Sequence, residues 1–558
     1  MSARAQRVTA LVRRVLRRVR RGETIGALEI PSSGAVVAPG RLRIIGWAVP
    51  ADRPVGRIEV RVDGETMGCA RPCATARRDV ARARRAPGAP LAGYEHVVTI
   101  SGAPGQHLRL DVDVIDIDGR SMRLRGADLE VGVPDANLPT APSVAAPRVQ
   151  RAASSDLRVV VFTHQLDIGG GQLYLQELVR GLLSDPGRSF LVVSTKDGAL
   201  RAELEALGAE VLVLDAPMVS TEVYEARVAV LQHITRAFGP DVALVNTMTA
   251  GIGADVAVRL GIPTIWAIHE SYRLDDYWIA AYGERGVAPE VRACITRALS
   301  TASAVIFEAD ATRAVYEPVV QPNRAVTVRY GIPVARILGA VRSQDVAAVR
   351  RSVGIDGDAT VVLCMGTFEP RKAQGALALA FAEVAGDFPH AVLVLVGDRD
   401  DEYSVGVREL VQRLGLGHRI RIEPIVDDPY PWYAAADAFL LASDIESMPR
   451  TLLEVMAFGV PVAAASAWGV PELVCDGENG LLFAPRDVNA LRTVVRRMLA
   501  LSPEERARLG AAGARTIAEQ HDAAGYIDAY RRLLPAIAAD PTVRPADVLA
   551  RSSSSKLT

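Results

Sequence analysis

Hydrophobic and polar residues alternate along residues 25–133. Asp63-Gly64 and Asp118-Gly119 each follow an alternating run, and both dipeptides are typical of tight β-hairpin turns. The alternation is clearest in three runs: 41–47, 57–62 and 108–117. Several short strands joined by turns predict a small all-β sandwich domain over 25–133.

The pattern changes at Leu157, where short apolar runs begin to alternate with longer segments of helical periodicity. Wholly apolar runs separated by helices are typical of parallel strands buried on both faces of an α/β sheet. We therefore expect two doubly wound, Rossmann-like domains, at 157–335 and 336–515. The apolar runs are 158–162, 190–193, 211–214, 242–245, 264–268, 304–307, 360–365, 392–396, 438–442 and 460–465.

Three segments fall outside these domains. Residues 1–24 form a basic amphipathic segment, because apolar residues recur at every third or fourth position of 1–22 among eight Arg and no acidic residue. This segment either lies on an anionic membrane surface or is a basic tail or a helix docked on the protein. Residues 134–156 are rich in Pro, Ala and Ser, which predicts a linker. Residues 539–558 are expected to be a disordered tail.

Composition narrows the function. The net charge is −1, so no nucleic-acid partner is expected. No apolar run approaches bilayer length, and no signal peptide is recognisable, so we expect a cytoplasmic chain, with contact to the inner face of the membrane as one interpretation of 1–22. The five cysteines form no zinc pattern. Cys364 and Cys475 are expected to be buried, and Cys69 and Cys73 are close enough in sequence to pair.

Two carboxylates stand out in the second α/β domain. Glu446 lies in the loop after the apolar run 438–442, and Glu454 lies in the helix that follows. Open α/β sheets bind ligands beyond the carboxyl ends of their strands, which is where Glu446 falls. Pro449 opens the helix, and a helix N-terminus offers free N–H groups to an anion, so Ser447, Met448 and Pro449 are candidates for donor contact.

The sequence around these residues resembles the retaining glycosyltransferases of family four, which have the GT-B fold. The resemblance covers 157–534. It rests on four elements at family spacing: Glu446 to Glu454, Ala457-Phe-Gly459-Val-Pro461-Val462, Gly469-Val-Pro-Glu472 and Asp476-Gly-Glu-Asn-Gly480-Leu-Leu. It implies two Rossmann-like domains that face a cleft, and a closing helix at 516–538 that returns to the N-terminal half. It also implies that Glu446 lies against the donor sugar and that Glu454 holds the ribose hydroxyls.

Further site residues follow from the family's motifs. The loop Gly169-Gly170-Gly171 matches the first loop, which faces the donor phosphates and the acceptor. His269 matches the family's His at a strand end, and His164 is a weaker candidate. Ile425 falls in the segment that edges the nucleotide base through its backbone. The segment 328–333 matches the interdomain turn, with Tyr330 in place of Asn and Pro333 in place of Asp.

The diphosphate clamp departs from the family pattern. The family has Gly-Arg and then a Lys five residues after the Arg. Lys372 keeps the second cation, whereas Thr367 replaces the Arg, and Arg371 is the candidate for the missing charge. A diphosphate leaving group gains charge as its bond to the sugar breaks, so cations placed in advance stabilise it.

These observations predict a retaining hexosyltransferase that uses a nucleotide-diphosphate sugar and a glycan, lipid-linked or other hydroxyl acceptor. No metal or other cofactor is expected, because no D-x-D cluster appears at a strand end. Glu446, His269 and Lys372 are the predicted catalytic residues. Two alternatives stay open: a nucleotide-sugar epimerase of related fold, and a degenerate sugar-binding or scaffold protein. The β module either docks a glycan, lipid or partner, with Trp47 able to stack on a sugar, or is a structural spacer.

Overall fold

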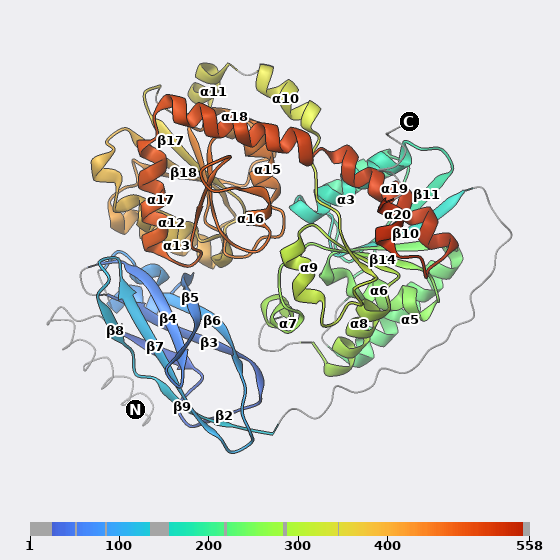
Figure 1. Ribbon diagram of the computed structural model, residues 1–558, viewed down its shortest axis with the longest axis horizontal. Helices are drawn as coiled ribbons and strands as arrows, with labels where there is room; N and C mark the ends of the chain where they lie inside the picture. Colours follow the sequence, from blue (N-terminus) through green and yellow to red (C-terminus); the bar gives the residue numbers. More distant parts are fainter. Residues whose placement is uncertain are drawn as a thin grey trace.

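The computed structural model describes residues 25–550 apart from 51–52, 84–85, 134–155, 217–219, 283–286, 344 and 356. The predicted amphipathic segment at 1–24, nearly all of the linker and residues 551–558 therefore lie outside the described residues. The described part consists of a β module and two α/β halves (Figure 1). This is the GT-B architecture with an N-terminal β domain that the sequence predicts.

The β module is one sheet that folds back on itself. Its strand order is β1-β3-β6-β5-β4-β7-β9-β2, and β8 pairs with β7. The strand β5 joins the two layers, because Ala70 pairs with Ile58 of β4 and Arg71 pairs with Glu95 of β6. The predicted sandwich is thus continuous along one edge and resembles a half-barrel. The strands are β1 (Ile25–Ile30), β2 (Ala35–Val37), β3 (Gly40–Val49), β4 (Val55–Val62), β5 (Glu65–Thr75), β6 (Gly93–Ile100), β7 (His107–Asp116), β8 (Ser121–Arg123) and β9 (Ala127–Val131).

Alternation places one face of each of these strands in a shared core, which includes Ile44, Val60, Tyr94 and Leu110. The predicted turn at Asp63 and Gly64 is present, and both residues have positive φ, at 49° and 88°. Two short helical segments interrupt the module, α2 (Arg78–Ala83) and the 3-10 turn η1 (Ala89–Leu91).

The N-terminal α/β half contains a seven-stranded parallel sheet of order β12-β11-β10-β13-β14-β15-β16. Its apolar strands are buried on both faces by helices, as their sequences require. The strands are β10 (Leu157–Thr163), β11 (Arg188–Ser194), β12 (Glu210–Val213), β13 (Val242–Asn246), β14 (Thr264–Ile268), β15 (Ala304–Phe307) and β16 (Ala325–Thr327). The helices are α3 (Gly170–Leu183), α4 (Leu200–Ala206), α5 (Thr221–Phe238), α6 (Gly251–Arg259), α7 (Leu274–Tyr282), α8 (Pro289–Thr301) and α9 (Asp310–Tyr316), with the 3-10 turn η2 (Met248–Ala250).

The C-terminal half contains a six-stranded parallel sheet of order β19-β18-β17-β20-β21-β22. Its strands are β17 (Thr360–Met365), β18 (Ala391–Asp398), β19 (Ile420–Pro424), β20 (Ala438–Leu441), β21 (Val462–Ala465) and β22 (Leu481–Phe483). Its helical segments are α10 (Val334–Ser343), α11 (Val346–Ser352), η4 (Pro370–Lys372), α12 (Gln374–Ala382), η5 (Ala385–Asp387), α13 (Glu402–Leu414), α14 (Tyr430–Ala435), α15 (Arg450–Ala457), α16 (Val470–Leu473), α17 (Val488–Ala500) and α18 (Pro503–Gln520).

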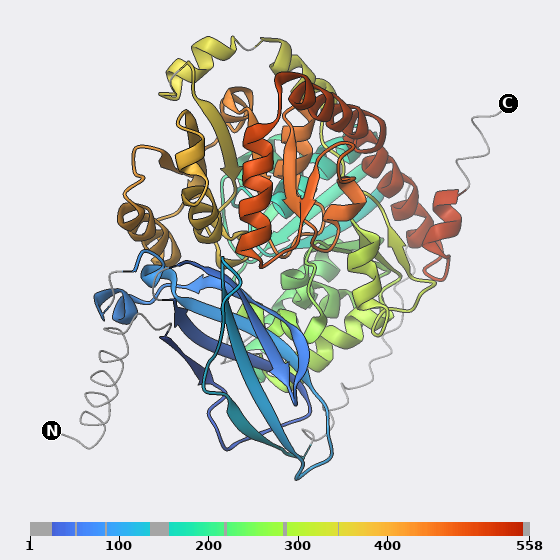
Figure 2. The same cartoon turned by 60° about the vertical axis from the view of Figure 1, so that its left-hand side comes forward.

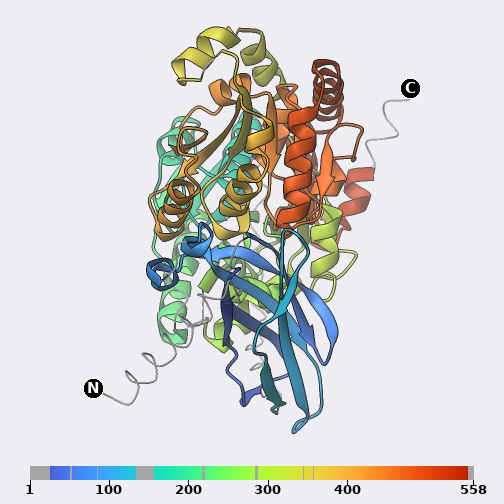
Figure 3. The ribbon, with the colours of Figure 1, turned by 90° about the vertical axis from the view of Figure 1, so that its left-hand side faces the viewer.

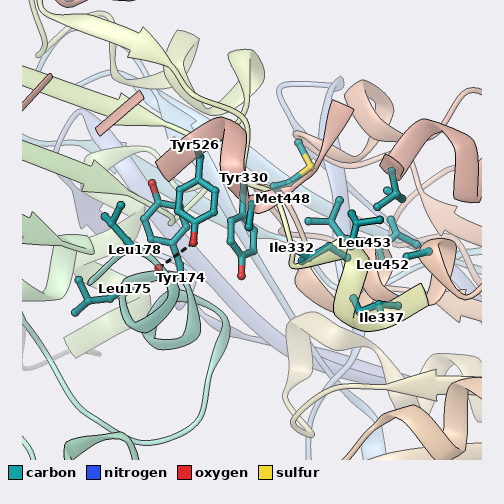
Figure 4. Close-up of a cluster of buried hydrophobic side chains, with 14 of the residues drawn as sticks. Tyr174, Leu175, Leu178, Tyr330, Ile332, Ile337, Met448, Leu452, Leu453 and Tyr526 are labelled. Carbon is teal, nitrogen blue, oxygen red and sulfur yellow. Dashed lines mark hydrogen bonds between the residues drawn. The ribbon is translucent and has the colours of Figure 1, made fainter. Parts of the chain in front are cut away.

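The chain returns to the N-terminal half through α19 (Ala523–Ala539), which follows α18 along one edge of both halves (Figure 1). The Tyr174 hydroxyl of α3 donates to the Tyr530 hydroxyl of α19 at 2.9 Å. The rings of Tyr174, Tyr330 and Tyr526 lie together there, with Met448 and Leu452 of the C-terminal half beyond them (Figure 4). One apolar cluster therefore joins α3, the interdomain turn and α15.

Two sequence predictions need correction. The tail is ordered as far as Ala550, because α20 (Pro545–Ala550) packs on α19, where the Arg532 guanidinium donates to the Leu549 carbonyl at 3.1 Å. Cys475 is exposed, since it lies in the turn before Asp476-Gly477 rather than in a strand, whereas Cys364 is buried. Cys69 and Cys73 are both free thiols.

Candidate functional site

The predicted cationic and acidic residues meet at the carboxyl edge of the C-terminal sheet. Arg371 and Lys372 lie in η4, shortly after β17, and Glu446 lies in the loop after β20. The strands β17 and β20 are neighbours in this parallel sheet, so the loops at their carboxyl ends are adjacent. The fold therefore assembles these three side chains from segments more than seventy residues apart.

Glu446 is the centre of this cluster. Its side chain is 9% exposed, and its Oε1 accepts a hydrogen bond from the Lys372 ammonium. A guanidinium nitrogen of Arg371 lies 3.6 Å from the same oxygen. Burial disfavours the charged form of Glu446, but Lys372 and Arg371 outweigh it and hold the pKa of the carboxyl below its usual value. The site thus carries an ionised carboxylate with two cations beside it.

Arg371 also organises the loop that carries Glu446. Its guanidinium donates to the Ile445 carbonyl at 3.1 Å and to the Glu369 carboxylate at 2.8 Å. In return, the Asp444 backbone N–H donates to the Arg371 carbonyl at 2.9 Å. Arg371, the residue predicted to replace the charge missing at Thr367, thus holds the loop through both its side chain and its backbone.

The residues after Glu446 contact the N-terminal half. Ser447 is buried, and its hydroxyl lies 3.3 Å from the Thr312 hydroxyl of α9. Met448 packs in the cluster around Tyr174, and Pro449 precedes the first residue of α15. Gly469 touches the Ser447 carbonyl so closely that a Cβ there would fall well inside 3.0 Å. The segment that begins at Gly469 therefore fixes the path of this loop.

The glycine-rich loop and His269 meet at the carboxyl edge of the N-terminal sheet. Gly170 and Gly171 begin α3, and the Gly171 carbonyl accepts a hydrogen bond from the Asn246 amide at 3.0 Å. A Cβ at Gly171 would lie 3.5 Å from the His269 ring, so the loop passes close over that imidazole. His164 bonds to Thr247 at 2.9 Å, and burial lowers its pKa to about 4.

Both ring nitrogens of His269 have partners within the protein. Nδ1 lies 2.9 Å from the Glu308 carboxylate, and Nε2 lies 2.8 Å from the side-chain amide oxygen Oδ1 of Asn246. Burial disfavours charge on this imidazole, yet the carboxylates of Glu308 and Glu270 raise its pKa above the usual value. Because both partners are hydrogen-bond acceptors, the arrangement suits an imidazolium that donates through both nitrogens. His269 therefore has an evident structural role at the place where a donor contact was predicted.

Glu454 belongs to a separate network close to the interdomain turn. Its Oε1 accepts from Arg450 at 2.7 Å and its Oε2 accepts from the Tyr433 hydroxyl at 3.0 Å. Arg450 continues across to Glu177 of α3 at 2.8 Å and also bonds to the Tyr330 hydroxyl. The two carboxylates of the motif thus have different neighbours, since Glu446 faces cations of its own half and Glu454 faces an arginine that bridges both halves.

Ile425 stands apart from these groups. It follows β19, which lies two strands from β17, and the residue is 55% exposed. Its backbone N–H donates to the Asp398 carbonyl at 3.3 Å. The backbone of this segment lies at the same edge of the sheet as Lys372 and Glu446, while its N–H is already engaged.

Glu472 and Arg450 make interdomain contacts that were not predicted from the sequence. The Glu472 carboxylate accepts from the backbone N–H groups of Asp310 at 3.0 Å and Ala311 at 2.7 Å, so a residue of the C-terminal half caps α9 of the N-terminal half. The Arg450–Glu177 pair is the second. The motif Gly469-Val-Pro-Glu472 marked the first residue, but nothing local in the sequence indicated its partner.

Within the described ranges, no group of three or more His, Cys, Asp or Glu side chains could hold a metal ion. No helix in that part of the chain is long and apolar enough to cross a membrane. Trp47 of the β module is only partly buried, and the Arg77 guanidinium lies 5.7 Å from its ring.

Two family models match the α/β halves. Residues 169–331 match the glycosyl transferase 4-like domain, and residues 345–516 match the glycosyl transferases group 1. Together they cover most of both Rossmann-like domains, including the Gly-rich loop, Lys372, Glu446 and Glu454.

Curated relatives agree with this assignment, and a solved structure agrees with the fold. A D-inositol 3-phosphate glycosyltransferase of Nocardioides sp. is 30% identical over 51% of this chain and 65% of its own length. The lipopolysaccharide core biosynthesis glycosyltransferase LpsE of Rhizobium meliloti is 32% identical over 34% of this chain and 54% of its own length. The chain therefore matches less than two thirds of each of these relatives. The crystal structure of Anabaena HepE in complex with UDP and glucose has a TM-score of 0.58 and 21% identity over 68% of this chain and 99% of that chain.

Proposed function

Because the chain belongs to the group 1 glycosyltransferases, with the GT-B fold, we propose that it transfers a sugar from a nucleotide-diphosphate sugar to a hydroxyl acceptor. The transfer would retain the configuration at the anomeric carbon and need no metal ion. The observation that carries the proposal is the buried Glu446 carboxylate with Lys372 and Arg371 beside it.

The cations supply what the leaving group needs. As the bond between the anomeric carbon and the phosphate oxygen breaks, negative charge grows on the diphosphate, and positive charge grows on the sugar ring. Lys372 and Arg371 would stabilise the former and Glu446 the latter. The acceptor oxygen then bonds to the anomeric carbon on the face that the phosphate leaves, and its proton passes to the departing phosphate oxygen. Glu446 is a stabilising group in this scheme and forms no covalent bond.

The remaining predicted residues would bind the donor. Glu454 would hold the ribose hydroxyls, and its existing bonds to Arg450 and Tyr433 leave acceptor capacity, because a carboxylate offers about four acceptor positions. Gly170, Gly171, Ser447 and Pro449 would bring backbone groups to the donor. Ile425 would lie beside the nucleotide base of the donor. His269, which was predicted to be catalytic, would hold the loops of the N-terminal half around the donor sugar or acceptor.

Release of nucleoside diphosphate from a panel of UDP-, GDP-, ADP- and TDP-sugars tests the proposal. We expect turnover of one donor, a loss of about 100-fold or more in Lys372→Ala and in Glu446→Gln, and no effect of EDTA. Arg201→Ala, which removes an exposed cation of α4, is the matched control. Absence of turnover with any donor, together with absence of UDP, GDP, ADP and TDP binding by calorimetry, would refute the proposal and favour the scaffold alternative.

For the acceptor, we propose a lipid-linked glycan. The name of LpsE refers to lipopolysaccharide core synthesis, and the basic segment 1–22 suits an anionic membrane surface. In a flotation assay with liposomes that contain anionic lipid, the full chain should float with the liposomes, whereas a variant that lacks 1–22 should not. Equal flotation of the two forms would remove this support.

A further inference from the structure

The β module is anchored to the C-terminal half by a packed apolar contact. Leu91 of η1 and Cys73 of β5 belong to the same buried cluster as Leu377 of α12 and Val407 of α13. Leu91 fits where Gly375 and Gly406 have no side chain, since a Cβ at either glycine would fall inside 3.0 Å of it. A contact of this kind fixes the module in one orientation. Figure 2 shows the module below the C-terminal half.

A second contact fixes the module to the N-terminal half. Arg41 of β3 donates two hydrogen bonds to the Asp276 carboxylate of α7, both at 2.7 Å. This bidentate pair is the strongest geometry that an arginine and a carboxylate adopt. The module therefore contacts both halves. Figure 3 shows it in front, below the C-terminal half.

Beside the apolar contact, the module reaches the loop that carries Glu446. Arg71 of β5 donates through its Nε to the Asp444 carboxylate at 2.9 Å. Arg486 of the C-terminal half bonds to the same carboxylate oxygen and reaches back to the Cys69 carbonyl of the module at 3.2 Å. The Asp444 side chain is 3% exposed, and the two arginines together hold its pKa below the usual value against the effect of burial.

Asp444 transmits this contact to the proposed site. It lies two residues before Glu446, and its backbone N–H donates to the Arg371 carbonyl at 2.9 Å. Arg371 in turn holds the Ile445 carbonyl and approaches Glu446. A buried carboxylate that loses one of its two cations is poorly compensated, and the segment that carries it rearranges or takes up water. The first segment affected would be the loop that positions Glu446.

We propose that Arg71 of the β module is a positioning residue for the transfer site, acting through Asp444 on Glu446 and Arg371. The inference rests on the proposed function and adds that the transfer site is incomplete without the module. Arg71 itself has no role in donor contact. A module that only bound glycan, or only filled space, would need no buried ion pair with this loop.

Hydrogen exchange of segment 443–448 and steady-state donor turnover test the proposal in the full-length protein. In Arg71→Ala we expect exchange of that segment to be about tenfold faster. We also expect a fall of about tenfold in kcat with a smaller change in donor KM, because the loop is misplaced rather than removed. Arg71→Lys keeps the charge, so its exchange in 443–448 and its kcat should both be close to those of the wild type. Arg71→Gln is the milder variant if Arg71→Ala folds poorly. In a background of Asp444→Asn, the same Arg71 changes should add little.

Arg123→Ala is the matched control, because Arg123 pairs with Asp113 within the module, at 2.8 Å. It should change neither measurement. Unchanged exchange in Arg71→Ala, equal acceleration in Arg123→Ala, or faster exchange with unaltered kcat would each overturn the proposal. Exchange does not depend on turnover, so a wild-type protein that turns over no donor would refute the proposed function while the exchange result still decides the role of Arg71.

Discussion

At the scale of single residues, the charge state of Glu446 is set by its two cations. Lys372 and Arg371 lower its pKa, while burial works in the opposite direction. Lysine contributes a compact charge that bonds directly to Oε1, whereas the Arg371 guanidinium is 3.6 Å away and is shared with Glu369. Lys372 is therefore the more important of the two for keeping Glu446 ionised.

This ordering predicts the pH dependence of donor turnover. In Lys372→Ala the pKa of Glu446 should rise, because burial is then opposed by Arg371 alone. The acid limb of the pH–rate profile should move to higher pH, in addition to the loss of rate at every pH. In Arg371→Ala the same limb should move less. An acid limb at the same pH in wild type and Lys372→Ala would contradict the assignment of that limb to Glu446.

His269 gives a prediction for stability. Its pKa is raised in the folded protein, mainly by Glu308 once the opposing effect of burial is overcome. The pair with Glu308 therefore stabilises the fold fully below the unfolded value of 6.5, and this contribution is lost as pH rises through the folded pKa. His269→Gln should lower the free energy of unfolding more at pH 6 than at pH 9, as measured by urea denaturation.

The control for this comparison is His418→Gln, which changes an exposed histidine. If the free energies of unfolding of wild type and His269→Gln differed by the same amount at every pH, the imidazole would act by shape and hydrogen bonding alone.

At the scale of elements, the sequence was most informative where the signal is local. Wholly apolar runs identified most strands of the two parallel sheets, although not β16, β19 or β22, and Pro449 and Gly459 marked the two ends of α15. The motif spacing brought Glu446 and Lys372 into one hypothesis, and the sheet order places them together. The helix α20 was missed because six residues show no clear periodicity, and its stability depends on packing against α19.

Contacts between distant elements gave no such signal. Arg450 and Glu177 are 273 residues apart, and Arg71 and Asp444 are 373 apart. Each pair consists of common residue types. Their pairing can be recognised only in the folded molecule, where the two halves and the module are in contact. Glu454 shows the same limit, since its motif was recognisable while its bonds to Arg450 and Tyr433 were not.

The loop from Glu446 to Pro449 depends on one glycine of the neighbouring segment. Gly469 has an ordinary φ of −77°, so the requirement for glycine comes from close approach to the Ser447 carbonyl rather than from backbone strain. Gly469→Ala should displace the loop and lower kcat by about tenfold or more, with a modest loss of stability.

Gly525→Ala is the control for Gly469→Ala, because nothing lies within 4 Å of a Cβ there. Steady-state turnover and thermal unfolding of the two variants separate the local effect from a general one. A Gly469→Ala protein with wild-type kcat would show that the Ser447 carbonyl moves aside without disturbing Glu446.

At the scale of the whole molecule, the β module and the C-terminal half share one hydrophobic cluster, so we expect them to unfold together. Leu91 is 1% exposed, although η1, which carries it, belongs to the module. Leu91→Ala should cost about 2–5 kcal/mol, because Gly375 and Gly406 have no side chains that could fill the space. This loss of stability should appear in the unfolding transition of the C-terminal half. The substitution should lower kcat as well, since Arg71 and Asp444 lie at the same interface.

Val36→Ala, at an exposed position of the module, should leave stability and kcat unchanged. Calorimetry combined with hydrogen exchange of α12 measures this coupling. If Leu91→Ala lowered only a separate transition of the β module, with exchange in α12 as in the wild type, the module would be an independent domain and its contact with the Glu446 loop would be incidental to the fold.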